Sequence, residues 1–200
     1  TILVLNWTEL LLKLITFQGP QGERLGAQLD DQHVVDLLRA AQAQGAAQAP
    51  HFESMLALIR AGAAALLEAR QVVAKTPASD YLALSELRLC APLPLPEQIR
   101  DFANYELHVK QALASSMRLR AQAEPDPEAA LVRLAASGQF AIPPVWYERP
   151  LYFKCNRFSA VGTDCDVQWP RFSQRMDYEL ELAVVIGKRV RDVSEQEAMD

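Results

Sequence analysis

The sequence predicts an α+β protein, with a small N-terminal β/α domain over residues 1–90 and a second domain over residues 91–200. Three observations support this prediction. Short β-prone runs separated by turn residues occupy residues 12–37, and a run with helical periodicity occupies residues 52–74. Strand-like segments then return after residue 150.

The first domain is expected to begin with three strands and then become helical. The strands are predicted, with turn residues between them, at residues 12–17, 24–29 and 33–37. A segment rich in alanine and glutamine at residues 38–49 predicts a weakly anchored helix that breaks at Gly45. The clearest helix is expected over residues 52–74, where apolar residues recur close to the helical period. We interpret it as a covering element without chemistry.

The second domain follows a stiff, extended segment at residues 91–96, in which every second residue is proline. Helices are predicted at residues 97–120 and 128–136. Strands are predicted at residues 151–154, 166–169 and 178–186. Ser194 with Glu197 fits a capping box that opens one more helix.

The composition indicates an ordinary globular protein and argues against several functions. Of the 200 residues, 50% are apolar and 22% are charged, and the formal net charge is −5. A mildly acidic chain without a basic cluster is poorly suited to nucleic acid, although a locally positive pocket can still accept a small anion. Three cysteines without a C-x-x-C pair argue against a disulfide framework or a zinc knuckle. They favour a reducing compartment, so a cytoplasmic location is predicted.

The two ends of the sequence lead to a separate expectation. No membrane span or signal peptide is predicted, because polar and charged residues interrupt the apolar start. The sequence begins at Thr1 rather than at methionine, and it stops at Asp200 inside the last predicted helix. We therefore expect that both ends have been cut. The apolar segment over residues 1–12 resembles no segment that we expect at the start of this chain.

The strongest chemical signal is the pair Glu179 and Glu181 in the strand predicted over residues 178–186. Alternate side chains of a strand share a face, so the two carboxylates would lie about 7 Å apart at Cα and converge on one cation. Without a cation they would repel each other, and each would favour protonation. Carboxylate oxygens suit Mg²⁺, Mn²⁺ or Ca²⁺ better than zinc. The alternative is a solvated sheet face with two ordinary glutamates.

Two further candidates rest on isolated residues. Asp101 and His108 would lie two turns apart on one face of the helix predicted over residues 97–120. An imidazole is a natural general base near neutral pH, although a lone helical histidine is more often structural or exposed. Lys154, on the strand predicted at residues 151–154, is a candidate to bind a substrate carboxylate, and the alternative is a solvated lysine.

Other kinds of catalytic site lack support. The sequence contains no G-x-S-x-G nucleophile elbow, no G-x-G-x-x-G loop and no H-E-x-x-H zinc motif.

Several motifs occur in a fixed order along residues 91–200. They are residues 98–102 (QIRDF), residues 105–108 (YELH), Lys154 with Ser159 and Gly162, Trp169 with Pro170, and residues 177–187 (DYELELAVVIG). In this combination the chain resembles the fumarylacetoacetate hydrolase family, most specifically over residues 151–188. More loosely, residues 14–17 (LITF), Gly26 and residues 34–38 (VVDLL) resemble the family's N-terminal region.

The resemblance implies a catalytic domain with a mixed β-roll, present here only in part if the C-terminus is truncated as expected. It implies a Mg²⁺ (or Mn²⁺ or Ca²⁺) site with Glu179, Glu181 and Asp101 as ligands, and His108 as the residue that activates water. In the implied mechanism, the metal polarises a 1,3-dicarbonyl substrate and activated water attacks one carbonyl. The carbon–carbon bond then breaks and leaves a metal-stabilised enolate. A homodimer is also implied.

The expected function is hydrolysis of a carbon–carbon bond in a small oxo-acid of the fumarylacetoacetate or acylpyruvate type, in aromatic or amino-acid catabolism. The alternatives are decarboxylation, isomerisation or hydration of a related 2-oxo dicarboxylate, a truncated non-catalytic chain, and a generic acidic binding module. Ala103 stands where the resemblance implies a substrate tyrosine, which leaves the substrate open. One metal aspartate and a catalytic lysine are expected beyond Asp200, and the acidic partner of His108 is not identified.

Overall fold

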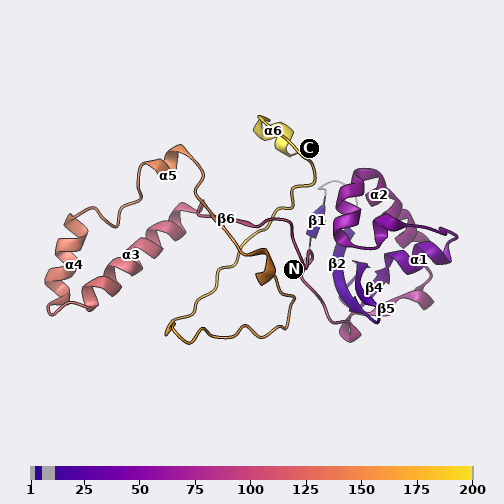
Figure 1. Ribbon diagram of the computed structural model, residues 1–200, viewed down its shortest axis with the longest axis horizontal. Coiled ribbons are helices and arrows are strands. Elements are labelled where there is room, and N and C mark those ends of the chain that lie inside the picture. Colours follow the sequence, from indigo (N-terminus) through magenta and orange to yellow (C-terminus); the bar gives the residue numbers. More distant parts are fainter. Residues whose placement is uncertain (1–2, 6–11, 200) are drawn as a thin grey trace. The chain divides into compact units, whose positions relative to one another are not determined.

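The computed structural model describes residues 3–5 and 12–199, so most of the apolar start over residues 1–12 lies outside the described residues. The chain packs as two compact units. The first unit comprises Thr1–Leu95 and Ser159–Asp200, and the second comprises Pro96–Phe158. Helices and strands both occur, which confirms the α+β prediction (Figure 1). Among the described residues, no helix is long and apolar enough to cross a membrane.

A five-stranded antiparallel sheet forms the body of the first unit, in the order β1-β2-β3-β4-β5. The strands are β1 (Leu3–Leu5), β2 (Leu12–Gly19), β3 (Gly22–Gln28), β4 (His33–Asp36) and β5 (Leu82–Ala83). Strands β2, β3 and β4 confirm the three strands predicted for this region. The β2–β3 hairpin pairs Gly19 with Gly22. Gly22 has a φ of 126°, which glycine adopts without a steric penalty.

Two helices and three short 3-10 helices accompany this sheet. They are α1 (Leu37–Ala43), α2 (Met55–Lys75), η1 (Pro50–Phe52), η2 (Ala78–Asp80) and η3 (Leu84–Glu86). Helix α1 ends just before Gly45, whose φ of 94° confirms the predicted break. Helix α2 was predicted as continuous but is interrupted at Gly62, which adopts a φ of 75° and a ψ of −156°. A backbone with positive φ cannot continue the helical hydrogen bonds, so α2 is kinked there.

The core of the first unit lies on both faces of the sheet. Helices α1 and α2 and the strand residues Leu14, Leu25 and Val35 contribute to the larger cluster, together with the fully buried Phe52. A smaller cluster on β2 and β4 packs against four partly buried leucines, Leu82, Leu84, Leu87 and Leu89. Because β2 is covered on both faces, it carries consecutive apolar residues rather than the alternation of a half-exposed strand.

The connector, residues 87–96, leaves this unit along the edge of β2. The amide of Gln18 donates to the carbonyl of Arg88 at 2.9 Å, and the amide of Cys90 donates to the carbonyl of Thr16 at 2.8 Å. The buried Thr16 hydroxyl donates to the Pro92 carbonyl at 2.7 Å. Strand β1 pairs with β2 only as far as Leu14, so the connector occupies the remaining edge of β2.

The second unit combines a two-stranded sheet with a helical hairpin. Its elements are β6 (Arg100–Phe102), α3 (Glu106–Gln122), α4 (Pro127–Ala136), α5 (Val145–Glu148) and β7 (Tyr152–Lys154), followed by η4 (Arg157–Ser159) at its end. Helices α3 and α4 pack through the buried Ala121, Ala130 and Leu134. Helix α4 and strand β7 confirm the elements predicted at residues 128–136 and 151–154.

The helix predicted over residues 97–120 is wrong in its first part. Residues 100–102 form β6, because they pair with β7 and bring the Phe102 and Tyr152 rings to 5.2 Å. The helix begins only at Glu106. Pairing between strands that are distant in sequence has overridden the local preference.

The strands predicted at residues 166–169 and 178–186 are absent. Residues 160–194 contain neither helix nor strand and follow an irregular path, drawn in orange to yellow in Figure 1. No described strand pairs with them, and a strand without a hydrogen-bonded neighbour is not stable. The short helix α6 (Glu195–Ala198) does form, and its Ser194–Glu197 capping box confirms that prediction.

Candidate functional site

Asp101 and Lys154 lie on the neighbouring strands β6 and β7 but on opposite faces of this two-stranded sheet. The register pairs Arg100 with Lys154 and Asp101 with Phe153. Directly paired residues of an antiparallel sheet project to the same face, and successive residues project to opposite faces. The structure therefore brings the two strands together without directing these two candidates at one point.

The face that carries Lys154 also carries Arg100, which the sequence reasoning missed. The Arg100 guanidinium lies 5.3 Å from the centre of the Tyr152 ring and donates to the Gln98 side chain at 3.0 Å. The register pairs Arg100 with Lys154, so two cationic side chains share this face, and the Arg100 guanidinium covers the Tyr152 ring. Such a face is suited to a small carboxylate. Only the strand register reveals it, and no local sequence signal does.

His108 is exposed in the first turn of α3, whereas Asp101 is half-buried on β6. The prediction that both lie two turns apart on one helical face is therefore wrong. The chain passes through an extended Tyr105 between strand and helix, which removes the helical spacing. His108 remains a candidate general base, because its exposed side chain is accessible to water and to a substrate.

Glu106, two residues before His108, joins α3 to α5. Its carboxylate accepts a hydrogen bond from the Tyr147 hydroxyl at 2.8 Å and forms an ion pair with Lys110 at 2.8 Å. Lys110 and then Tyr147 lower the pKa of Glu106, and Glu106 raises the pKa of both partners. The indole of Trp146 also donates to the carbonyl of Ala103, so α5 is held against the strand-to-helix turn.

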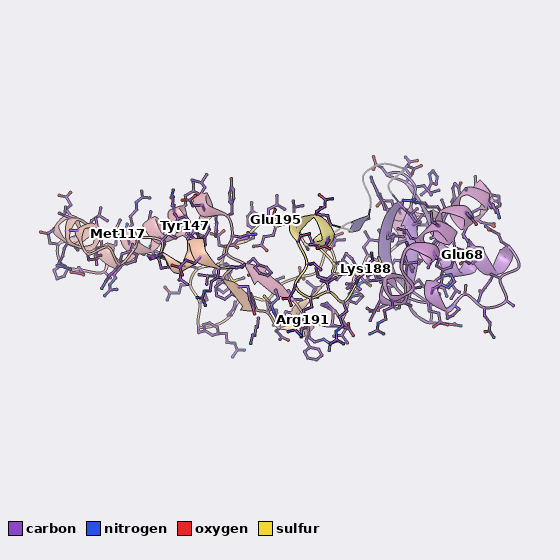
Figure 2. The ribbon with its side chains drawn as sticks, turned by 90° about the horizontal axis from the view of Figure 1, so that it is seen from above. Glu68, Met117, Tyr147, Lys188, Arg191 and Glu195 are labelled. Atoms are coloured by element: carbon purple, nitrogen blue, oxygen red, sulfur yellow. The ribbon has the colours of Figure 1, made fainter. Side chains whose placement is uncertain are left out.

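A shallow hollow of about 350 Å³ lies beside this group. It is lined mainly by apolar side chains of α3 and of the segment before α5, including Leu113, Met117 and Phe140. Met117 and Tyr147, both labelled in Figure 2, belong to its lining. Its apolar lining is unlike a metal site, and Lys110 is already paired with Glu106.

Replacing Lys110 with methionine should raise the pKa of Glu106 towards its ordinary value, because the strongest partner of the charged form is lost. Since the folded-state pKa is lowered, the stability contributed by Glu106 is present above the unfolded-state value and is lost as the pH falls through the folded-state value. Carboxyl ¹³C NMR titration measures this pKa directly. Lys154→Met is the control and should leave it unchanged, and an unaltered Glu106 titration in Lys110→Met would contradict the assignment.

Glu179 and Glu181 lie in the irregular stretch over residues 160–194, and both are exposed. Their apolar neighbours Leu180 and Leu182 are 97% and 100% exposed, and only further along does Val185 pack against the larger core cluster. The prediction that the two glutamates share one face of a strand is therefore not confirmed by the structure.

The carboxylates of the candidate residues are chemically suited to a hard cation. Within residues 3–5 and 12–199, no three histidine, cysteine, aspartate or glutamate side chains are arranged to hold a metal ion. Asp101, Glu179 and Glu181 are the residues whose oxygen donors would hold such an ion.

Comparison with known proteins decides the family. Residues 98–200, just over half of the chain, match the family model described as fumarylacetoacetate (FAA) hydrolase C-terminal. The chain belongs to the fumarylacetoacetate hydrolase family. All five candidate residues lie inside the matched region: Asp101, His108, Lys154, Glu179 and Glu181.

The curated relatives match a shorter stretch of this chain than the family model does. An uncharacterised protein of Pyrococcus abyssi is 40% identical over 53 residues, which are 26% of this chain and 24% of the relative. Oxaloacetate tautomerase fahd2, mitochondrial, of Xenopus laevis is 40% identical over 53 residues, or 26% of this chain and 17% of the relative. An uncharacterised protein of Methanocaldococcus jannaschii is 55% identical over 53 residues, or 26% and 22%. The aligned part thus spans less than a quarter of each of these relatives.

Proposed function

We propose that this chain is part of a divalent-metal-dependent hydrolase that cleaves a carbon–carbon bond in a small 1,3-dicarbonyl oxo-acid. One observation carries the proposal: the family match over residues 98–200 contains the three candidate metal ligands, the candidate base and the candidate lysine that would bind the substrate. The proposed reaction class follows from Asp101 and His108, which match the hydrolase branch of the family in the motif resemblance described above. The proposed catalytic domain is the mixed β-roll of this family.

The β6–β7 sheet supports an anionic substrate. Arg100 and Lys154 are paired across the two strands, so their charges add at one face. A substrate carboxylate bound there would relieve the repulsion between the two cations. In this proposal Lys154 and Arg100 orient the acid end of the substrate.

The remaining roles follow from side-chain chemistry. An imidazole nitrogen of His108 takes a proton from the attacking water, which an exposed histidine near neutral pH is suited to do. Glu179, Glu181 and Asp101 are the proposed oxygen ligands for Mg²⁺, Mn²⁺ or Ca²⁺. When bound, such an ion would supply polarisation of a substrate carbonyl. A homodimer and a cytoplasmic location are proposed from the family resemblance and the cysteine content, respectively.

A second candidate is tautomerisation of oxaloacetate, favoured by the match to the Xenopus laevis oxaloacetate tautomerase. That reaction moves a proton between carbon and oxygen and breaks no carbon–carbon bond. Product analysis by NMR separates the two, because an acylpyruvate hydrolase yields two acids whereas a tautomerase only equilibrates keto and enol forms. Decarboxylation would release carbon dioxide, and hydration would add water without cleavage.

Isothermal titration of Mg²⁺ and Mn²⁺ into the chain is expected to show saturable binding. The Glu179→Ala/Glu181→Ala variant should lose it, with affinity reduced by more than about 10-fold, because it lacks two of the three proposed ligands. Glu148→Ala/Glu195→Ala is the matched control: it removes two exposed glutamates elsewhere and should bind as the wild type does. Equal binding by all three chains, or binding by none of them, would overturn the metal site.

A further inference from the structure

Two of the three cysteines belong to segments that the fold brings together. Cys90 lies in the connector, where its amide is hydrogen-bonded to Thr16 of β2. Cys165 lies 75 positions further along the chain, in the irregular stretch after Ser159. Both segments belong to the first unit, and both cysteines are half-buried free thiols. Cys155, by contrast, is exposed and lies in the second unit.

The two segments come into direct backbone contact at Gly162. A Cβ atom added to Gly162 would clash with the Leu89 carbonyl oxygen and would lie 2.8 Å from the Cys90 Cα. Backbone lies against backbone here, and only glycine leaves room for that contact. The position of Gly162 in the family motif therefore has a local packing reason: it seats its segment on the connector.

A turn then carries the chain from Gly162 to Cys165. Thr163 and Asp164 form the turn, and Asp164 has a φ of 55°. The ends of a four-residue turn lie within about 7 Å of each other, so Cys165 returns to the neighbourhood of Gly162 and of Cys90. The electrostatic influence of Cys165 on the Cys90 thiol agrees with this proximity. The two thiols are thus held in one neighbourhood, which is the first requirement for a disulfide between them.

We propose that Cys90 and Cys165 form a reversible disulfide bond that fastens the segment after Ser159 to the connector beside β2. The oxidant is a low-molecular-weight disulfide such as oxidised glutathione. The Cys165 thiolate attacks one sulfur of it, which breaks that S–S bond, forms a mixed disulfide and releases one small thiolate. The Cys90 thiol loses its proton to solvent, and its thiolate attacks the Cys165 sulfur and displaces the second small thiolate. Two protein thiols are oxidised, and the small disulfide is reduced to two thiols.

The surroundings of Cys90 determine the rate of this thiol–disulfide exchange. Burial raises the pKa of the Cys90 thiol; Glu23 and Cys165 act in the same direction, and Arg88 opposes them. The thiolate of Cys90 is therefore scarce near neutral pH, and ring closure should accelerate as the pH rises. The bond closes a long loop of chain, so it should also raise the Tm by several degrees.

The test is oxidation of the dilute 200-residue chain with oxidised glutathione, followed by thiol titration and peptide mass spectrometry. We expect the free thiols to fall from three to one, with a peptide linking Cys90 to Cys165 that dithiothreitol releases. Cys155→Ser should still form the link and show the raised Tm, whereas Cys165→Ser should do neither. Three thiols that persist, mixed disulfides that never close, or links that include Cys155 would each overturn the proposal.

Discussion

Replacing His108 with alanine should lower kcat/KM for an acylpyruvate in the presence of Mg²⁺ by about 10²- to 10⁴-fold, the usual contribution of a positioned general base. The side chain is exposed in the first turn of α3, so its removal leaves no cavity and should not unfold the second unit. The loss should appear in kcat rather than in KM, because the imidazole acts on the water and does not bind the substrate. Steady-state kinetics measures both parameters.

Gln111→Ala is the matched control, since Gln111 is exposed on the same helix and should keep full activity. A His108→Ala variant as active as the wild type would remove His108 from the mechanism while leaving the reaction class intact. A wild-type chain that cleaves neither acylpyruvate nor any related 1,3-dicarbonyl acid would instead contradict the proposed hydrolase function.

Replacing Asp36 with alanine should destabilise the first unit by about 2–4 kcal/mol. The Asp36 carboxylate is buried and accepts hydrogen bonds from the Arg24 guanidinium at 2.7 and 3.0 Å. It also caps α1 by accepting from the Arg39 amide at 3.0 Å. Its loss leaves a partly buried guanidinium without its carboxylate and removes the helix cap. Urea unfolding followed through NMR signals of β2 and β3 amides measures the change.

Two further variants separate the parts of this effect. Asp36→Asn keeps an oxygen that can cap α1 but loses the charge, so its destabilisation should be intermediate. Asp31→Ala removes an exposed aspartate nearby and should change the stability by less than about 0.5 kcal/mol. If Asp36→Ala were no less stable than Asp31→Ala, the bidentate pair would contribute nothing.

The first unit was predictable because its signals are local. The hairpin residues Gly19 and Gly22 and the break at Gly45 act through their own backbone preferences, and β2, β3 and β4 then pair with one another as close neighbours in sequence. The kink at Gly62 was missed because a single glycine in a helical pattern is usually accommodated. The connector along β2 was missed because nothing in residues 87–96 indicates its distant partner.

The candidate site was predictable in its residue types but not in its geometry. Asp101 moved from helix to strand because β7, far along the chain, supplies the pairing. Arg100 emerged only from that register. Glu179 and Glu181 keep their alternation in the sequence, but alternation becomes a shared face only when neighbouring strands hold the backbone extended, and no described strand does so here.

The exposed apolar row in residues 178–186 has a practical consequence for handling the protein. Leu180, Leu182, Val184 and Ile186 are 97%, 100%, 85% and 76% exposed. A β-prone, unpaired window of this kind promotes self-association in concentrated solutions. The exposed apolar side chains occupy the even positions, whereas Glu179 and Glu181 occupy odd positions. A lysine introduced at Leu182 would therefore act as a gatekeeper against precipitation while leaving both glutamates in place.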